Sequence, residues 1–233
     1  MSRLELQREL AREHVFVDGM VDGITKKYAK KMKVVGESCL LGITKYTNPT
    51  TRNTMWVVWY KEWNGHFNDI CYSYFIEYLD DRTRNWLLPL NGCHKIDPNG
   101  ENDLVLIYTQ HALERLKERA GLDFQGFIRE SLNQRFRVMR TTYEYNGVES
   151  TGIALGNKGL FLLDKGVWGT VCKTFVSADL LGESQNASME ESIDGTNEFG
   201  NRLDQDFYAR ADKFYKGLRR SERRKIKKIS AVA

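Results

Sequence analysis

The sequence predicts an α+β fold in which helices at both ends of the chain flank a mainly antiparallel sheet. Apolar residues recur at helical spacing near the N-terminus and again in residues 202–229. Between these ends, β-branched and aromatic runs are separated by turn signals such as Asn64-Gly65 and Asn146-Gly147. With 233 residues, the chain is long enough for one large domain or two small ones.

The first hundred residues predict an N-terminal α+β region, 1–100. Ser2 and Glu5 have the spacing of a capping box, which marks the start of a helix. A second helical stretch ends in a lysine-rich turn, which suits the negative end of a helix dipole. Aromatic and β-branched runs on either side of Asn64-Gly65 predict a hairpin. The predicted elements are helices at 2–14 and 18–33, and strands within 34–47 and at 54–63, 66–79 and 84–90.

A module of two helices followed by an antiparallel meander is predicted for residues 101–181. Its first strand leads into a helix that begins after Thr109 and ends at Gly121, because glycine is common just past helix ends. Polar and acidic residues dominate 182–201, which predicts an exposed loop or linker, and 202–233 predicts a basic C-terminal helix. The predicted elements of the module are a strand at 103–109, helices at 110–120 and 124–134, and about four strands between 136 and 180. Strong interleaving would join all these parts into one domain.

Charge is distributed unevenly along the chain. The net charge is +4, but from Phe207 onward ten Lys and Arg residues accompany only two acidic residues. The tail therefore carries +8 and the rest of the chain −4. No apolar run approaches the roughly 18 residues of a membrane span, and the first residues lack the apolar core of a secretory signal. The sequence thus predicts a cytoplasmic protein that does not act in a membrane.

Motifs for cofactors and metals are absent from the sequence. It contains neither a GxxxxGK[ST] loop nor a dinucleotide fingerprint, and it lacks a His-Glu-x-x-His zinc motif. Cys71 and the Cys93-His94 pair, together with His66, match no zinc-ligand spacing. We therefore expect no cofactor and no metal.

The helix at 110–120 carries the residues that point most directly to chemistry. His111, Arg115 and Arg119 are four residues apart and form a stripe along it. Metal-independent RNA cleavage needs a base for the 2′-hydroxyl, cations for the charge on phosphorus, and an acid for the leaving oxygen. Lys173 and Thr174 would add a charge clamp and a hydrogen-bond donor to phosphate. Because glutamates lie close by, a salt-bridged surface helix explains the same stripe.

Residues of about 103–180 resemble the ribonuclease-like modules of the barnase–EndoU–colicin–RelE superfamily, especially toxin types. The resemblance rests on a leading strand, the segment HALERLKERAG, the short helix FIRESL and the late strand VCKTFVSADL. It implies a metal-independent endoribonuclease, a hydrolase acting on RNA. It also implies that the catalytic set consists of His111, Arg115, Arg119, Lys173 and Thr174. An antitoxin-like or other protein partner is left open, and the sequence does not identify one.

Two other features favour binding without catalysis. The basic tail suits RNA or another polyanion, through Arg219, Arg220, Arg223, Arg224, Lys225, Lys227 and Lys228. The aromatic residues between Trp56 and Trp86 would stack nucleobases if one face of the hairpin were exposed, although core packing explains them as well. The alternative function is therefore a non-catalytic nucleic-acid-binding protein or an adaptor of a mobile element or phage.

Overall fold

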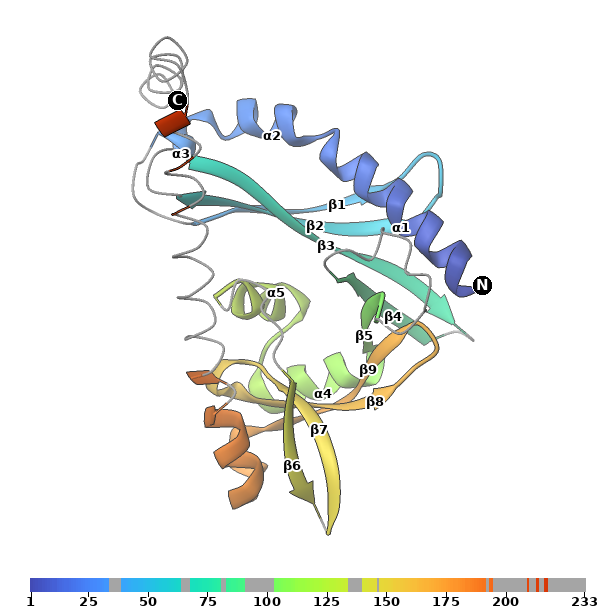
Figure 1. Cartoon of the computed structure of the whole chain (residues 1–233), viewed down its shortest axis with the longest axis vertical. Helices are drawn as coiled ribbons and strands as arrows, with labels where there is room; N and C mark the ends of the chain where they lie inside the picture. Colours follow the sequence, from blue (N-terminus) through green and yellow to red (C-terminus); the bar gives the residue numbers. More distant parts are fainter. Residues whose placement is uncertain are drawn as a thin grey trace.

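The computed structural model shows an α+β protein built on one continuous sheet (Figure 1). It describes residues 1–33, 39–63, 68–80, 83–90, 103–133, 140–145, 147–191 and 193–194, with the isolated positions 209, 213, 216 and 217. The hairpin turn Asn64-Gly65 and the tail residues from Arg219 to Lys228 lie outside the described residues, as does most of the predicted C-terminal helix. Among the described residues, no helix combines the length and apolar character that crossing a membrane requires.

The N-terminal helices begin as the sequence predicts. In α1 (Arg3–Asp18), the Ser2 side chain accepts from the Glu5 backbone, and the Glu5 carboxylate accepts from the Ser2 backbone, which confirms the capping box. The helix runs past the predicted end at residue 14 to its C-cap at Gly19. The predicted second helix is divided into α2 (Val21–Lys27) and α3 (Ala29–Met32), because Tyr28 leaves the helical conformation between them.

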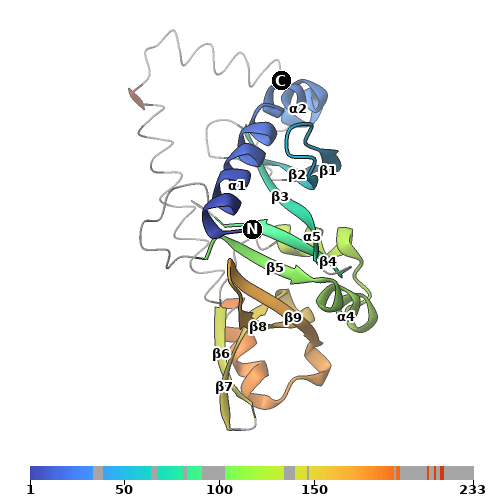
Figure 2. The same ribbon diagram turned by 90° about the vertical axis from the view of Figure 1, so that its right-hand side faces the viewer.

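The first four strands form an antiparallel series. They are β1 (Cys39–Thr47), β2 (Thr54–Trp63), β3 (Asn68–Asp80) and β4 (Thr83–Pro89), each paired with the next. Alternate residues of β2 face opposite sides of the sheet, as strand geometry requires. Met55 and Trp59 pack beneath α1, whereas Val58 packs with the helices of the second half. Figure 2 shows α1 on one side of the sheet and the later helices, α4 and α5, on the other.

The second half of the chain extends the same sheet. Its elements are β5 (Val105–Thr109), α4 (Gln110–Ala120), α5 (Phe124–Asn133), β6 (Arg140–Tyr145), β7 (Val148–Ala154), β8 (Gly159–Lys165) and β9 (Gly169–Ser177), with short 3₁₀ turns at Gly156–Lys158 and Ala178–Leu180. The strand order is β1-β2-β3-β4-β5-β9-β8-β7-β6, in which β5 and β9 are parallel. Gly169 begins β9 with φ 155°, and a Cβ there would lie 2.1 Å from the Val105 carbonyl oxygen, so the close approach requires glycine.

The predicted boundary near residue 100 is crossed by regular strand pairing. β4 pairs antiparallel with β5, from Asn85 opposite Thr109 to Pro89 opposite Val105. Backbone hydrogen bonds therefore join the two predicted regions directly. The apolar cluster that contains Val58 and Phe75 of the first region also contains Tyr108 of the second.

A helix replaces part of the predicted loop at 182–201. Residues 183–191 and 193–194 are helical, and Leu181, Gln185 and Met189 are buried. Gln185 and Met189 are four residues apart, so they lie on one helix face, and Leu181 precedes the helix in an extended conformation. Met189 packs with Leu160 of β8, and the Ser188 hydroxyl donates to the Thr142 carbonyl of β6 at 2.9 Å. The polar composition suggested a loop, but one buried residue per turn is enough when the helix covers a sheet edge.

Candidate functional site

Local signals fix both ends of α4. The Thr109 hydroxyl accepts from the backbone N–H of Ala112 at 3.1 Å and so acts as the N-cap. Gly121 ends the helix with φ 67°, the left-handed conformation that glycine adopts without strain. Both ends agree with the prediction from sequence. His111 consequently lies in the first turn, where its side chain is exposed.

One side of α4 covers an unpaired edge of β9. The β5–β9 ladder ends at the pair formed by Tyr108 and Cys172, so the rest of β9 pairs with no strand on that side within the described part of the chain. The Thr109 hydroxyl lies 3.0 Å from the Cys172 carbonyl oxygen, and Arg119 Nη1 donates to the Phe175 carbonyl oxygen at 2.6 Å. The side chains of the N-cap Thr109 and of Arg119 thus donate to backbone carbonyl groups at this edge. Arg119 therefore has a structural role in this arrangement.

The other cations of the predicted catalytic set also have protein partners. Arg115 forms an ion pair with Glu118 at 2.7 Å on the surface of α4. Lys173 of β9 forms an ion pair with Asp164 of β8, and this ion pair lowers the pKa of the Asp164 carboxyl. Exposed ion pairs of this kind contribute little to stability.

Lys173 and Thr174 lie on the opposite face of β9 from α4. A register shift makes Lys173 an extra residue, since Thr174 pairs with Leu162 and Cys172 with Leu163. Cys172 packs in the apolar cluster of α4, whereas Leu162 packs with the helix that begins at residue 183. The structure therefore brings His111, Arg115 and Arg119 together on one helix but directs the Lys173 and Thr174 side chains away from it.

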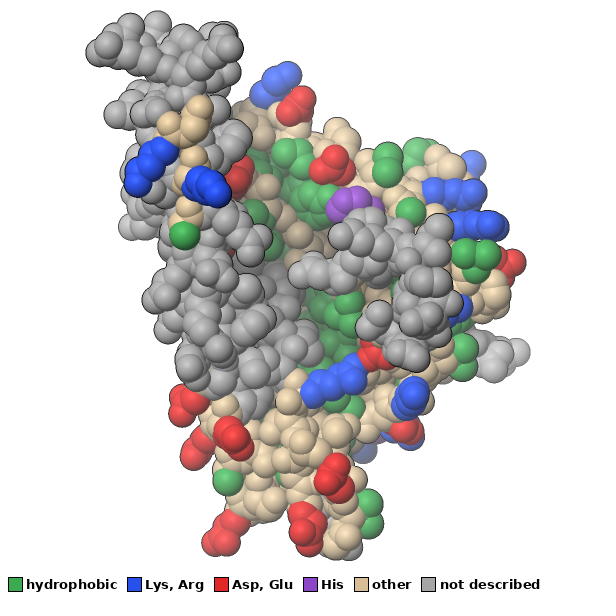
Figure 3. Space-filling view, in the orientation of Figure 1, with side chains coloured by type: hydrophobic (Ala, Val, Ile, Leu, Met, Phe, Trp, Pro, Cys, Tyr) green, Lys and Arg blue, Asp and Glu red, His purple; other side chains and the backbone are tan. Residues whose placement is uncertain are grey.

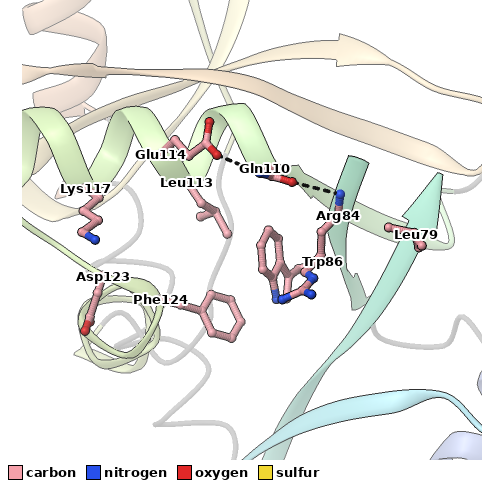
Figure 4. A pocket seen from close by; sticks show the side chains of 9 residues that line it. All are labelled: Leu79, Arg84, Trp86, Gln110, Leu113, Glu114, Lys117, Asp123 and Phe124. Carbon is pink, nitrogen blue, oxygen red and sulfur yellow. Dashed lines mark hydrogen bonds between the residues drawn. The ribbon is translucent and has the colours of Figure 1, made fainter. Parts of the chain in front are cut away.

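A cavity of about 530 Å³ lies on the other side of α4 (Figure 4). This volume falls within the roughly 300–1,000 Å³ typical of ligand pockets. Its walls come from the ends of β3 and β4, one face of α4 and the start of α5. The lining residues are Leu79, Arg84, Trp86, Gln110, Leu113, Glu114, Lys117, Asp123 and Phe124.

Aromatic rings form one wall of this cavity. The ring centroids of Trp86 and Phe124 lie 5.3 Å apart with their planes 32° from parallel. Both side chains are only partly buried, so part of each ring can contact a ligand. The Trp86 indole nitrogen is buried and has no hydrogen-bond partner among the described residues. An unsatisfied buried donor of this kind is costly in an apolar setting.

The charged side chains around the cavity differ in whether they already have a hydrogen-bond partner in the protein. The Glu114 carboxylate accepts from Gln110 Nε2 at 2.8 Å, and Asp123 Oδ1 accepts from the Gly126 backbone at 2.7 Å in the first turn of α5. The side chains of Arg84 and Lys117 form no ion pair or hydrogen bond with any residue that the structure describes. The two carboxylates keep their charge but are held by neutral donors, whereas the hydrogen-bond donors of the Arg84 and Lys117 side chains remain available to an anionic group.

Figure 3 shows no continuous basic face over the described part of the surface: acidic side chains gather at the lower end of the view, and cationic side chains lie in separate groups above it. A metal centre also finds no support, because the described residues contain no group of three or more His, Cys, Asp and Glu placed to hold an ion. Cys71 donates to Glu62 at 3.4 Å; burial and then the Glu62 charge raise the pKa of its thiol to about 12. His66 and the Cys93-His94 pair lie outside the described residues.

Sequence reasoning singled out α4 but did not point to the face of this helix that lines the cavity. Gln110, Leu113 and Lys117 recur at helical spacing, a signal that was available in the sequence. Arg84 and Trp86 alternate along β4, which points them to the same side of the sheet. Which helix face meets these strand residues depends on the path of the chain between distant elements, and the sequence does not show that path.

Comparison with known protein families, with curated proteins and with solved structures finds no match to this chain. The resemblance to ribonuclease modules therefore stays a prediction from sequence. The case for function rests on the geometry around α4.

Proposed function

We propose that this protein binds single-stranded RNA in the cytoplasm without the need for a cofactor, and that the cavity beside α4 is its binding site. The carrying observation is the pairing of an aromatic wall, Trp86 and Phe124, with two unpaired cations, Arg84 and Lys117. A nucleobase stacked on an aromatic ring gains about 1–3 kcal/mol, and this gain tolerates different base sequences. The cations would hold the adjacent phosphate.

Single-stranded RNA suits the cavity better than a duplex does. Bases are available for stacking only when they are unpaired, as in loops and single strands. The lining groups also suit a nucleotide more than a purely apolar ligand, because Gln110 and Glu114 place polar groups next to the rings. The basic tail would add affinity that is independent of sequence and sensitive to salt.

Fluorescence anisotropy with a labelled unstructured RNA tests this proposal. We expect the double variant Arg84→Ala/Lys117→Ala to bind at least about tenfold more weakly at low salt, because two phosphate contacts are lost. Both side chains extend from the cavity rim without internal partners in the described part, so the variant should fold. Arg8→Ala is the control, since Arg8 is an exposed cation of α1 on the opposite side of the sheet. Equal affinity of the double variant and the control variant would reject the cavity as the site.

Metal-independent RNA cleavage is a second candidate, favoured by the position of His111. The second half has the chain order of one strand, two helices and four strands. His111 is exposed in the first turn of α4, where developing negative charge is stabilised by the helix end. Incubation of RNA with the protein in EDTA tests this candidate. Cleavage that disappears in His111→Ala would support it, and intact RNA with the wild-type protein would reject it as a general activity.

A further inference from the structure

A row of side chains leads from the cavity across the first four strands. Lys45 of β1 lies directly opposite Trp56 of β2, and Glu77 of β3 lies directly opposite Trp86 of β4. The side chains of directly opposed residues point to the same face of a sheet. Since neighbouring strands are about 4.8 Å apart, the row from β1 to β4 spans about 14 Å.

Aromatic contacts make this row continuous with the cavity wall. Phe124 lies between the two tryptophans, with its ring centroid 5.4 Å from that of Trp56 and 5.3 Å from that of Trp86. All three side chains are partly exposed. We call these three adjacent rings the platform; Phe124 meets Trp56 edge-on at 75° and Trp86 at 32°, so they offer several contact points rather than a single stacking site.

The charges along the row favour a phosphate backbone. Glu77 accepts from the Trp56 indole nitrogen at 2.6 Å and from Lys45 Nζ at 2.9 Å, so the carboxylate is engaged from two sides. The Glu77 side chain is 15% exposed, whereas the Lys45 side chain is 47% exposed. Lys45 Nζ also lies 5.1 Å from the centre of the Trp56 ring. The ammonium group, with donors left over, is therefore the charge that the end of the row presents to solvent.

We infer that the binding site extends over this row and takes a single RNA strand of about four nucleotides, not a lone nucleotide. This inference rests on the proposed function and deepens it. One base occupies the cavity at Trp86 and Phe124, the strand crosses the platform to Trp56, and Lys45 binds a phosphate at the far end. Bases stacked on one another advance about 3.4 Å per nucleotide, which is the shortest spacing of a strand, so about 14 Å accommodates at most about four nucleotides.

Binding of oligouridylates of one, two, four and eight nucleotides to the full-length protein tests the inference, with tryptophan fluorescence as the readout. We expect affinity to rise up to four nucleotides and then to level off. Lys45→Ala should weaken binding of the four-nucleotide strand about tenfold and leave the mononucleotide unchanged, because only the longer ligand reaches β1. In Lys45→Ala the Glu77 carboxylate loses its ion-pair partner and could repel the RNA. The double variant Lys45→Ala/Glu77→Gln removes this carboxylate as well, so an equal loss of affinity in both variants excludes repulsion by Glu77 as the cause. Lys158→Ala, a change of an exposed lysine outside the row, is the control.

The failures of the two proposals are distinguishable. If Arg84→Ala/Lys117→Ala loses affinity but binding is independent of both length and Lys45, the cavity binds RNA and the extended row does not. That result overturns the inference alone. If the wild-type protein binds no oligonucleotide of any length, the proposed function fails and the inference fails with it. A circular dichroism spectrum equal to that of the wild type shows that each variant is folded.

Discussion

Glu13 is a buried carboxylate that ties α1 to the loop between β1 and β2. It is fully buried and accepts hydrogen bonds from Asn48 at 2.7 Å, from Asn53 at 2.9 Å and from the Thr51 hydroxyl. Glu13→Ala would leave these donors without their acceptor. We expect the free energy of unfolding to fall by about 3 kcal/mol, measured by urea denaturation. Arg12→Ala changes an exposed neighbour and should have little effect; equal midpoints for both variants would contradict the prediction.

Glu77 should make stability depend on pH. Burial raises the pKa of its carboxyl, but hydrogen bonds from Trp56 and Lys45 and the charges of Lys45 and Arg84 together bring it below the ordinary value. A lowered acid pKa stabilises the fold above the unfolded-state pKa, about 4.3 for Glu, and this contribution disappears as the pH falls through the folded-state value. Unfolding of Glu77→Gln should therefore vary less between about pH 5 and pH 3 than unfolding of the wild type. Parallel pH profiles would show that Glu77 contributes nothing.

At the scale of one element, α4 depends on Thr109 both as N-cap and as a contact to β9. Thr109→Ala removes the acceptor of Ala112 and the hydroxyl near Cys172, and we expect a loss of about 1–2 kcal/mol in urea denaturation. Thr109→Ser keeps the hydroxyl and should retain most of the stability. A serine variant as unstable as the alanine variant would assign the loss to the methyl group instead.

Elements with local signals could be predicted from the sequence, and elements that depend on distant partners could not. Thr109 and Gly121 mark the ends of α4 within the helix itself, so both were predicted correctly. The helix that begins at residue 183 has one buried residue per turn, and it is fixed by contacts such as Ser188 to Thr142 of β6. The parallel pairing of β5 with β9 joins residues more than sixty positions apart and has no local signal.

In the candidate site, too, the features with a local signal could be predicted from the sequence, and those that depend on distant elements could not. The stripe of His111, Arg115 and Arg119 was visible in the sequence because its charges are regularly spaced. In the structure, Arg119 donates to the Phe175 carbonyl at the β9 edge, and Arg115 forms an ion pair with Glu118. The cavity lies on the neighbouring face of the same helix. Helical spacing alone cannot choose between these faces. The choice is made by β4 and α5, which enclose the cavity side.

At the scale of the whole molecule, one continuous sheet should make the two halves unfold together. The β4–β5 pairing places backbone hydrogen bonds across the predicted boundary, and an apolar cluster spans it through Phe75 and Tyr108. Separating the halves would expose this cluster and leave an unpaired edge on each side. The molecule is therefore expected to behave as one cooperative unit rather than as two linked domains.

Two matched core variants test this cooperativity. Leu6 is on the buried face of α1, and Leu160 is buried in β8 at the other end of the sheet. Each change to Ala should cost about 2–5 kcal/mol, because it removes buried methyl groups and leaves a cavity. In a cooperative molecule, Leu6→Ala lowers the protection of the most slowly exchanging amides in β8 as much as in β2. Leu160→Ala likewise lowers the protection of the slowest amides equally in both strands. Hydrogen exchange measured by mass spectrometry reads both halves at once. Loss of protection confined to the half that carries the substitution would show that the sheet unfolds in two steps.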